Sequence, residues 1–122
     1  MPFQNEKPIF LQLAEQLESG ILSGAYPEGS QVPSITEYAA TYKINPATAN
    51  KAISLLVNAG LLYKKRGIGM FVAEGAQAAL RRKRSEDFYH DYVETLVREA
   101  RNLDLSLDQL IELIQRGYQD GT

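Results

Sequence analysis

Cysteine and tryptophan are absent from the 122 residues, and His90 is the only histidine. Without cysteine there can be no disulfide, thiolate metal cluster or cysteine nucleophile, and one histidine cannot supply a multi-histidine metal site. No set of residues combines the nucleophile, base and stabilising group that an enzyme active site requires. We therefore expect no metal, no cofactor and no enzymatic activity.

Long apolar runs are also missing. None approaches the roughly 20 residues needed to cross a bilayer, and the first eight residues lack the basic and apolar regions of a signal peptide. We expect a cytoplasmic protein with no membrane partner. The length fits one domain, or one domain with a small appendage, and the 44% apolar and 23% charged residues are ordinary for a globular protein.

Acidic residues are missing from one part of the chain. The formal net charge is only -2, from 13 basic and 15 acidic residues, yet every charged residue from Lys43 to Arg66 is basic. A surface that binds nucleic acid needs local positive charge rather than a basic protein overall. The acidic composition therefore does not exclude a nucleic-acid partner.

Three helices are predicted before residue 61. Apolar residues spaced four apart predict the first, over about residues 8–23. Ser34 and Glu37 have the spacing of a capping box and predict a short second helix. Asn45 followed by Pro46 marks the start of a third helix. The last two helices are joined by a turn of roughly four residues, which is the helix-turn-helix pattern.

The hydrophobic period changes from 3.6 to 2 after residue 60. Residues 61–64 and 70–73 are predicted to form two short strands around a basic turn that contains glycine. Such a hairpin after a helix-turn-helix is the wing of a winged helix-turn-helix. We therefore predict a mainly α fold with a small β-hairpin, in which residues 1–75 form a DNA-binding domain.

Residues 76–122 are predicted to form a short two-helix tail. One helix covers about residues 76–101, and a second capping box, from Ser106 to Gln109, starts another. Two amphipathic helices of this length cannot bury both apolar stripes by themselves, so we predict that the tail forms a homodimer. An unidentified small-molecule effector could bind between the tail helices of the two subunits, near Phe88, Tyr92 and Tyr118, or regulation could act through hinge motion at residues 74–76. The predicted dimer interface contains Phe88, Tyr92, Leu96, Leu110, Ile111 and Ile114.

The start of the third predicted helix carries side chains that can read DNA. A helix fits the major groove, where its N-terminal residues face base edges and phosphates. Asn50 can pair with adenine through two hydrogen bonds, Ala47 can pack on a thymine methyl group, and Lys51 can neutralise a phosphate. Lys64 can lie along the backbone beside the wing tip. The predicted DNA-binding residues of both helices and the wing are Ser34, Thr36, Asn45, Ala47, Thr48, Asn50, Lys51, Lys65, Arg66 and Gly67.

Each of these features also has a purely structural interpretation. Asn45 and Ser34 can cap helices in any protein, the basic turn can be a solvated loop, and its glycines can serve the hairpin alone. Their order and spacing favour DNA binding, because one duplex could contact all of them together. A winged domain that binds another protein instead of DNA is the alternative that the acidic composition leaves open.

Several segments resemble the DNA-binding domain of GntR-family transcription regulators, in consistent order over about residues 8–73. They are Pro8–Leu13, Ile21–Gly29, Val32–Ser34, Ile44–Ala49, Ala59–Tyr63 and Arg66–Val72. The short tail resembles that of the YtrA subfamily. The resemblance implies a homodimeric regulator, a repressor by expectation, that binds a two-fold related operator through the residues named above.

Asn50 and Pro46 stand where some branches of the family carry further arginines, but the departure that matters is at Thr36. Thr36 stands where GntR-family proteins usually have an arginine that contacts DNA. Exchange of arginine for threonine removes a charge-assisted contact of about 1–3 kcal/mol. The departure predicts weaker binding, or a preference shifted toward A·T-rich operators.

Overall fold

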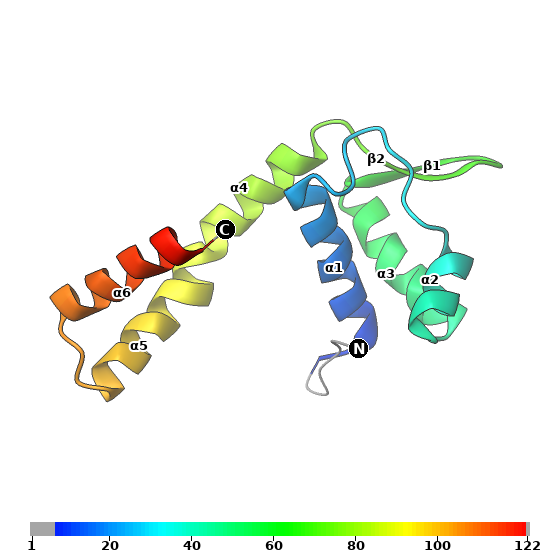
Figure 1. Ribbon diagram of the computed structural model, residues 1–122. Helices are drawn as coiled ribbons and strands as arrows, with labels where there is room; N and C mark the ends of the chain where they lie inside the picture. Colours follow the sequence, from blue (N-terminus) through cyan, green and yellow to red (C-terminus); the bar gives the residue numbers. More distant parts are fainter. Residues whose placement is uncertain (1–6, 122) are drawn as a thin grey trace. The chain divides into compact units, whose positions relative to one another are not determined.

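The computed structural model describes residues 7–121, and it is mainly helical with one two-stranded antiparallel hairpin (Figure 1). The chain divides into two compact units, one ending at Arg82 and the other beginning at Lys83. The first unit is a winged helix-turn-helix, as predicted. Among the described residues, no helix combines the length and the apolar composition needed to cross a membrane.

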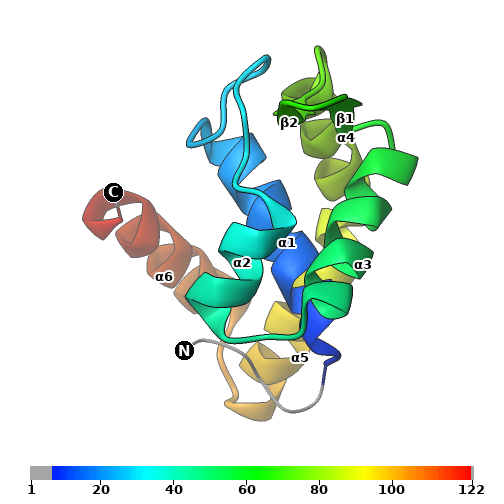
Figure 2. The ribbon, with the colours of Figure 1, turned by 90° about the vertical axis from the view of Figure 1, so that its right-hand side faces the viewer.

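Helix α1 (Ile9–Ser23) forms the back of the first unit. Its apolar residues recur on one face, and Leu13, Leu17 and Ile21 are almost completely buried. The helix ends at Gly24, whose φ of 88° lies in the left-handed region that favours glycine. The predicted first helix is confirmed. Figure 2 shows α1 behind the two helices that follow it.

Helices α2 (Ile35–Tyr42) and α3 (Pro46–Asn58) form the helix-turn-helix. The capping box that begins α2 is complete: the Glu37 amide donates to Ser34 Oγ, and the Ser34 amide donates to Glu37 Oε1, both over 3.0 Å. At the start of α3, the Ala47 amide donates to Asn45 Oδ1 over 2.8 Å. Both predicted helix starts are therefore confirmed.

The hairpin consists of β1 (Leu62–Lys65) and β2 (Gly69–Val72), with Leu62 opposite Val72 and Lys65 opposite Gly69. These strands lie one residue away from the predicted ranges, 61–64 and 70–73. The segment before α2 runs along β2, where the Val32 amide donates to the Met70 carbonyl over 2.9 Å. Pairing between strands rather than composition sets their ends, which explains the shift.

One apolar core holds the first unit together. Its buried residues come from α1, α2, α3, the hairpin and the first turns of α4 (Ala76–Phe88). Burial, with a further contribution from neighbouring Tyr26, raises the pKa of Tyr38 above its ordinary range, so this phenol stays neutral. Two hydrogen bonds also tie the start of α4 to this unit: the Gly75 amide donates to Glu28 Oε1 and Gln77 Nε2 donates to the Leu22 carbonyl, each over 2.9 Å.

The tail contains α5 (Glu94–Asn102) and α6 (Leu107–Asp120). A π-helical turn, η1 (Tyr89–Val93), joins α4 to α5, so the prediction of one uninterrupted α-helix over residues 76–101 is wrong at this turn. The capping box that begins α6 is confirmed, because the Gln109 amide donates to Ser106 Oγ over 3.1 Å. In this unit the buried apolar residues are Ala100 and Leu110.

Candidate nucleic-acid interface

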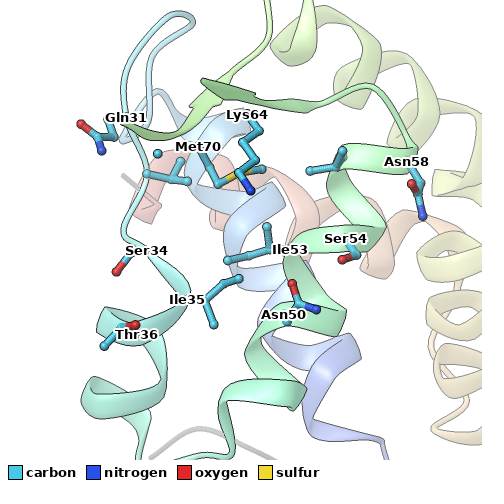
Figure 3. A pocket seen from close by; sticks show the side chains of 13 residues that line it. Gln31, Ser34, Ile35, Thr36, Asn50, Ile53, Ser54, Asn58, Lys64 and Met70 are labelled. Atoms are coloured by element: carbon cyan, nitrogen blue, oxygen red, sulfur yellow. The ribbon is translucent and has the colours of Figure 1, made fainter. Parts of the chain in front are cut away.

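The start of α2 presents two hydroxyl groups to solvent. Ser34 Oγ accepts the capping bond from the Glu37 amide, but its own hydroxyl hydrogen can still be donated, because a hydroxyl combines one donor with two acceptor sites. Thr36 lies two residues further on and is exposed. Both are among the residues that line a cavity at this end of α2, and Figure 3 shows them at the start of the helix. This end of α2 can therefore donate hydrogen bonds to phosphate oxygens.

Helix α3 separates its polar side chains onto two sides. Asn50, Ser54 and Asn58 lie on successive turns and line the same cavity (Figure 3). Lys51 lies on the side nearer α1, where its Nζ is 4.1 Å from the centre of the Phe10 ring. This distance is within the range of a cation–π contact. Asn50 and Lys51 are adjacent in sequence, but the fold directs them to different surroundings.

The residues at the start of α3 differ in which side-chain groups are exposed and not already used in a helix cap. The oxygen of Asn45 is used to cap the helix, so only its NH₂ group remains to donate a hydrogen bond. Ala47 and Asn50 are exposed, and Thr48 is half-buried. The methyl group of Ala47 and the amide of Asn50 are thus available to base edges.

The two lysines of β1 lie on opposite faces of the hairpin, as the alternation of strand side chains requires. Lys64 lines the cavity beside Met70 and points toward α3 (Figure 3). Lys65 Nζ lies on the other face, 4.4 Å from the centre of the Phe71 ring and 5.9 Å from that of Tyr63. The fold therefore places Lys64, rather than Lys65, on the side of α2 and α3. Strand alternation could have indicated from the sequence that the two lysines lie on opposite faces, but not which of them faces the helices.

The wing tip is held in place by a residue that the sequence did not single out. Gln31 Nε2 donates to the Ile68 carbonyl over 3.0 Å. A Cβ atom placed on Gly69 would lie 2.5 Å from this nitrogen, so a larger residue there would displace it. Arg66 and Gly67 form the exposed tip, and the φ of 77° at Gly67 favours glycine. Gln31 is 37 positions from Ile68, and no local pattern could have paired them.

A cavity of about 450 Å³ lies between the start of α2, the middle of α3 and the hairpin. Its apolar lining comes from Val32, Ile35, Ile53, Val57 and Met70, and hydroxyl and amide groups surround its opening (Figure 3). Ser34, Thr36 and Asn50 therefore meet around one hollow surface. Lys65 is not among the residues that line the cavity, and neither is Lys51.

The predicted dimer residues lie in different environments. Leu110 is 9% exposed, so it is already buried within its own chain. The other five are exposed, and the rings of Phe88 and Tyr92 lie 5.4 Å apart between their centres. A shallow, open depression lies on α6 beside Ile114 and Tyr118. The tail thus presents an apolar surface that its own unit leaves uncovered. The five exposed predicted residues are Phe88, Tyr92, Leu96, Ile111 and Ile114.

Sequence comparison identifies relatives of this chain. The family described as "Bacterial regulatory proteins, gntR family" matches residues 10–72. The uncharacterized HTH-type transcriptional regulator YhcF of Bacillus subtilis (strain 168) is 29% identical over 119 residues, which cover 98% of this chain and 97% of that protein. The HTH-type transcriptional repressor YtrA of the same organism is 27% identical over 112 residues, covering 92% of this chain and 85% of YtrA.

Solved structures show the same fold. A transcriptional regulator of the GntR family from Bacteroides thetaiotaomicron is 32% identical and matches with a TM-score of 0.70, over 93% of this chain and 99% of that one. The DNA-binding domain of AraR in complex with operator ORX1 is also 32% identical, with a TM-score of 0.54 over 60% of this chain and 89% of that one.

Proposed function

The chain belongs to the gntR family of bacterial regulatory proteins, and from this premise we propose that it is a sequence-specific DNA-binding transcription regulator. By this proposal residues 1–75 bind an operator and residues 76–122 form a homodimer. The expected role is that of a repressor, which the name of the relative YtrA supports. The chain covers most of that short relative, which also supports its assignment to the YtrA subfamily.

One observation carries the proposal: three separate elements bring DNA-binding chemistry to one surface. Ser34 and Thr36 come from α2, Asn50 from α3 and Lys64 from the hairpin, and all four line the same cavity. Convergence from elements far apart in sequence is not required by helix capping or by hairpin geometry. AraR, which shares this fold in its DNA-binding domain, forms a complex with its operator.

Each side chain has a role that follows from its chemistry. The hydroxyl groups of Ser34 and Thr36 bind phosphate, and the first turn of α3 enters the major groove with Ala47, Thr48 and Asn50 facing base edges. Asn45 contributes its NH₂ group, and Lys51 reaches phosphate after leaving the Phe10 ring. Arg66 and Gly67 place the wing tip at the minor groove, where glycine avoids a clash.

The homodimer would place two such surfaces on one DNA. Two winged units related by two-fold symmetry bind half-sites about one helical turn, or a multiple of it, apart. The exposed apolar side chains of the tail, including Phe88, Tyr92 and Leu96, support this part of the proposal because their burial requires a partner. An effector pocket between the tail helices remains a prediction.

The proposal is tested by fluorescence anisotropy of the full chain with DNA from upstream of its own gene and with scrambled DNA. We expect binding at least about a thousandfold tighter to the first, with a steep salt dependence. Asn50→Ala should cost about 1–3 kcal/mol and relax specificity at one base pair. Asn58→Ala is the matched control, because it removes the same amide two turns further along α3.

Equal and weak binding to both DNAs would contradict the proposal. The winged unit would then be a protein-binding module, and a partner recovered from nuclease-treated extract would be the next observation to seek. Equal losses for Asn50→Ala and Asn58→Ala would instead show that the start of α3 is not the base-reading segment.

A further inference from the structure

The cavity beside α3 has the size and composition of a small-molecule site. Its volume of about 450 Å³ lies within the range of roughly 300–1,000 Å³ that is typical of ligand pockets. Val32 and Ile53 in its lining are each 2% exposed, so the lining includes part of the stable core. Polar groups also belong to the lining: Asn50 and Ser54 of α3 lie near the apolar side chains in Figure 3 and can donate hydrogen bonds.

The charge of the lining selects the kind of ligand. Lys64 is the charged residue among those that line the cavity, and no carboxylate lines it within the described part of the chain. Glu37 of α2 accepts a hydrogen bond from the Ser34 amide in the capping box, and it does not line the cavity. One cation among neutral donors favours an anionic ligand, and a monoanion carries the charge that one lysine balances.

We propose that this cavity binds a small organic monocarboxylate, with its aliphatic or aromatic body against the apolar lining and its carboxylate near Lys64 and the amides of α3. The occupied cavity is incompatible with bound operator. This second statement rests on the proposed function, since Ser34, Thr36 and Asn50 both line the cavity and are assigned to DNA. The protein would then respond to an acid directly in its winged unit.

The mutual exclusion has a thermodynamic consequence. When two ligands need the same surface, each lowers the protein's affinity for the other by the same factor. The apparent affinity for operator therefore falls as the carboxylate concentration rises.

The first test uses benzoate as the probe and the full chain without DNA. Titration followed by amide NMR should give saturable shifts at Gln31–Thr36, Asn50–Asn58 and Gly69–Met70 at millimolar benzoate. Benzamide, the neutral isostere, should bind at least about tenfold more weakly, because it lacks the charge that Lys64 pairs with. Absence of local shifts, or equal shifts with benzamide, would overturn the proposed site.

Two variants test the location. Val57→Phe should weaken benzoate binding at least about tenfold by filling the cavity, since Val57 lines it and is 36% exposed. Leu55→Phe is the matched control, because Leu55 is 39% exposed on the same helix but does not line the cavity. Lys64→Gln provides a second variant, which removes the charge with little change in volume. Retained binding in both Val57→Phe and Lys64→Gln would overturn the site.

The competition is measured separately, by operator anisotropy with benzoate at constant ionic strength. We expect the apparent operator dissociation constant to rise with benzoate, and more steeply than linearly for a dimer in which both cavities must be empty, with chloride at the same ionic strength as the control. Binding of benzoate that leaves operator affinity unchanged would overturn the exclusion. If the chain bound no operator at all, the proposed function would fail, while the NMR titration would still decide the carboxylate site.

Discussion

The two units of the chain use their apolar residues in opposite ways. In the winged unit, side chains from α1, α3 and the hairpin close a core in which Leu13 and Val72 have no exposed surface. In the tail, Tyr92 is 64% exposed and Leu107 is 72% exposed. The winged unit closes an apolar core of its own, whereas the tail leaves large apolar side chains exposed to water.

Similar local sequence signals in two units therefore do not imply that both units bury their own apolar side chains. Both units contain a serine capping box, at Ser34 and Ser106, with hydrogen bonds of comparable length. Caps stop helices from fraying, but they bury no apolar surface. How much apolar surface a unit buries depends on how many of its helices and strands pack against one another. More elements pack together in the winged unit than in the tail.

The largest expected effect concerns the winged core. Leu56→Ala should destabilise this unit by about 2–5 kcal/mol, because Leu56 is 2% exposed and its removal leaves a void. Leu55→Ala, one residue away at 39% exposure, should cost about 1 kcal/mol or less. Amide hydrogen exchange measures the loss of stability in each variant, separately for the winged unit and the tail. Equal costs would show that the core is not closed as described.

The next effect concerns the tail. Leu96→Glu should weaken the proposed dimer by about 3 kcal/mol, or more than about a hundredfold, because a carboxylate would be buried without a partner. Arg98→Gln changes the net charge by the same amount on the opposite side of the helix, and should leave the dimer intact. Sedimentation equilibrium distinguishes the two. If the unmutated chain had the mass of a monomer, the proposed dimer and the comparison built on it would be wrong.

A smaller effect separates the two faces of the wing. Lys64→Gln should weaken operator binding about tenfold, roughly 1.4 kcal/mol, and lower the salt slope by about one unit. Lys65→Gln should change both less, because its ammonium group rests on the Phe71 ring on the other face. Anisotropy at several salt concentrations measures these slopes. The reverse order would place the DNA on the outer face of the hairpin.

The smallest effect compares the two capping boxes. Ser34→Ala and Ser106→Ala should each destabilise their own helix by about 1 kcal/mol, as seen in hydrogen exchange of α2 and α6. Only Ser34→Ala should also weaken operator binding, since its hydroxyl is assigned to a phosphate. Loss of DNA affinity in Ser106→Ala at concentrations that keep the dimer intact would contradict this division of roles.

Most of the fold was predictable because its signals are local. Helical spacing, capping boxes and the change of period placed α1, α2, α3, α6 and the hairpin, with strand ends wrong by one residue. The π-helical turn was missed because Phe88, Tyr92 and Leu96 are spaced by four, which fits an α-helix and a wider turn alike. An inserted residue within one turn leaves no mark in such a pattern.

For the candidate site, the sequence predicted which residues belong to it but not how they are arranged in space. The sequence selected Ser34, Thr36 and Asn50 from their chemistry, but it treated Lys64 and Lys65 as parts of one basic turn and did not say which of them faces α2 and α3. It also gave no reason to notice Gln31, whose side chain bonds to the Ile68 carbonyl. Contacts between distant segments depend on how the strands pair, which local patterns do not encode.

By itself the sequence determined the order of the elements, the helix starts at Ser34, Asn45 and Ser106, and the family to which the chain belongs. The order of the elements and the helix starts follow from spacing and capping chemistry, which act over a few residues, and the family follows from the match over residues 10–72. Tertiary structure alone decided that Lys64 faces the cavity and Lys65 the aromatic rings, and that the cavity exists. The physical reason is that a side chain's surroundings are set by whichever elements pack against it, and packing joins residues that are far apart in the chain.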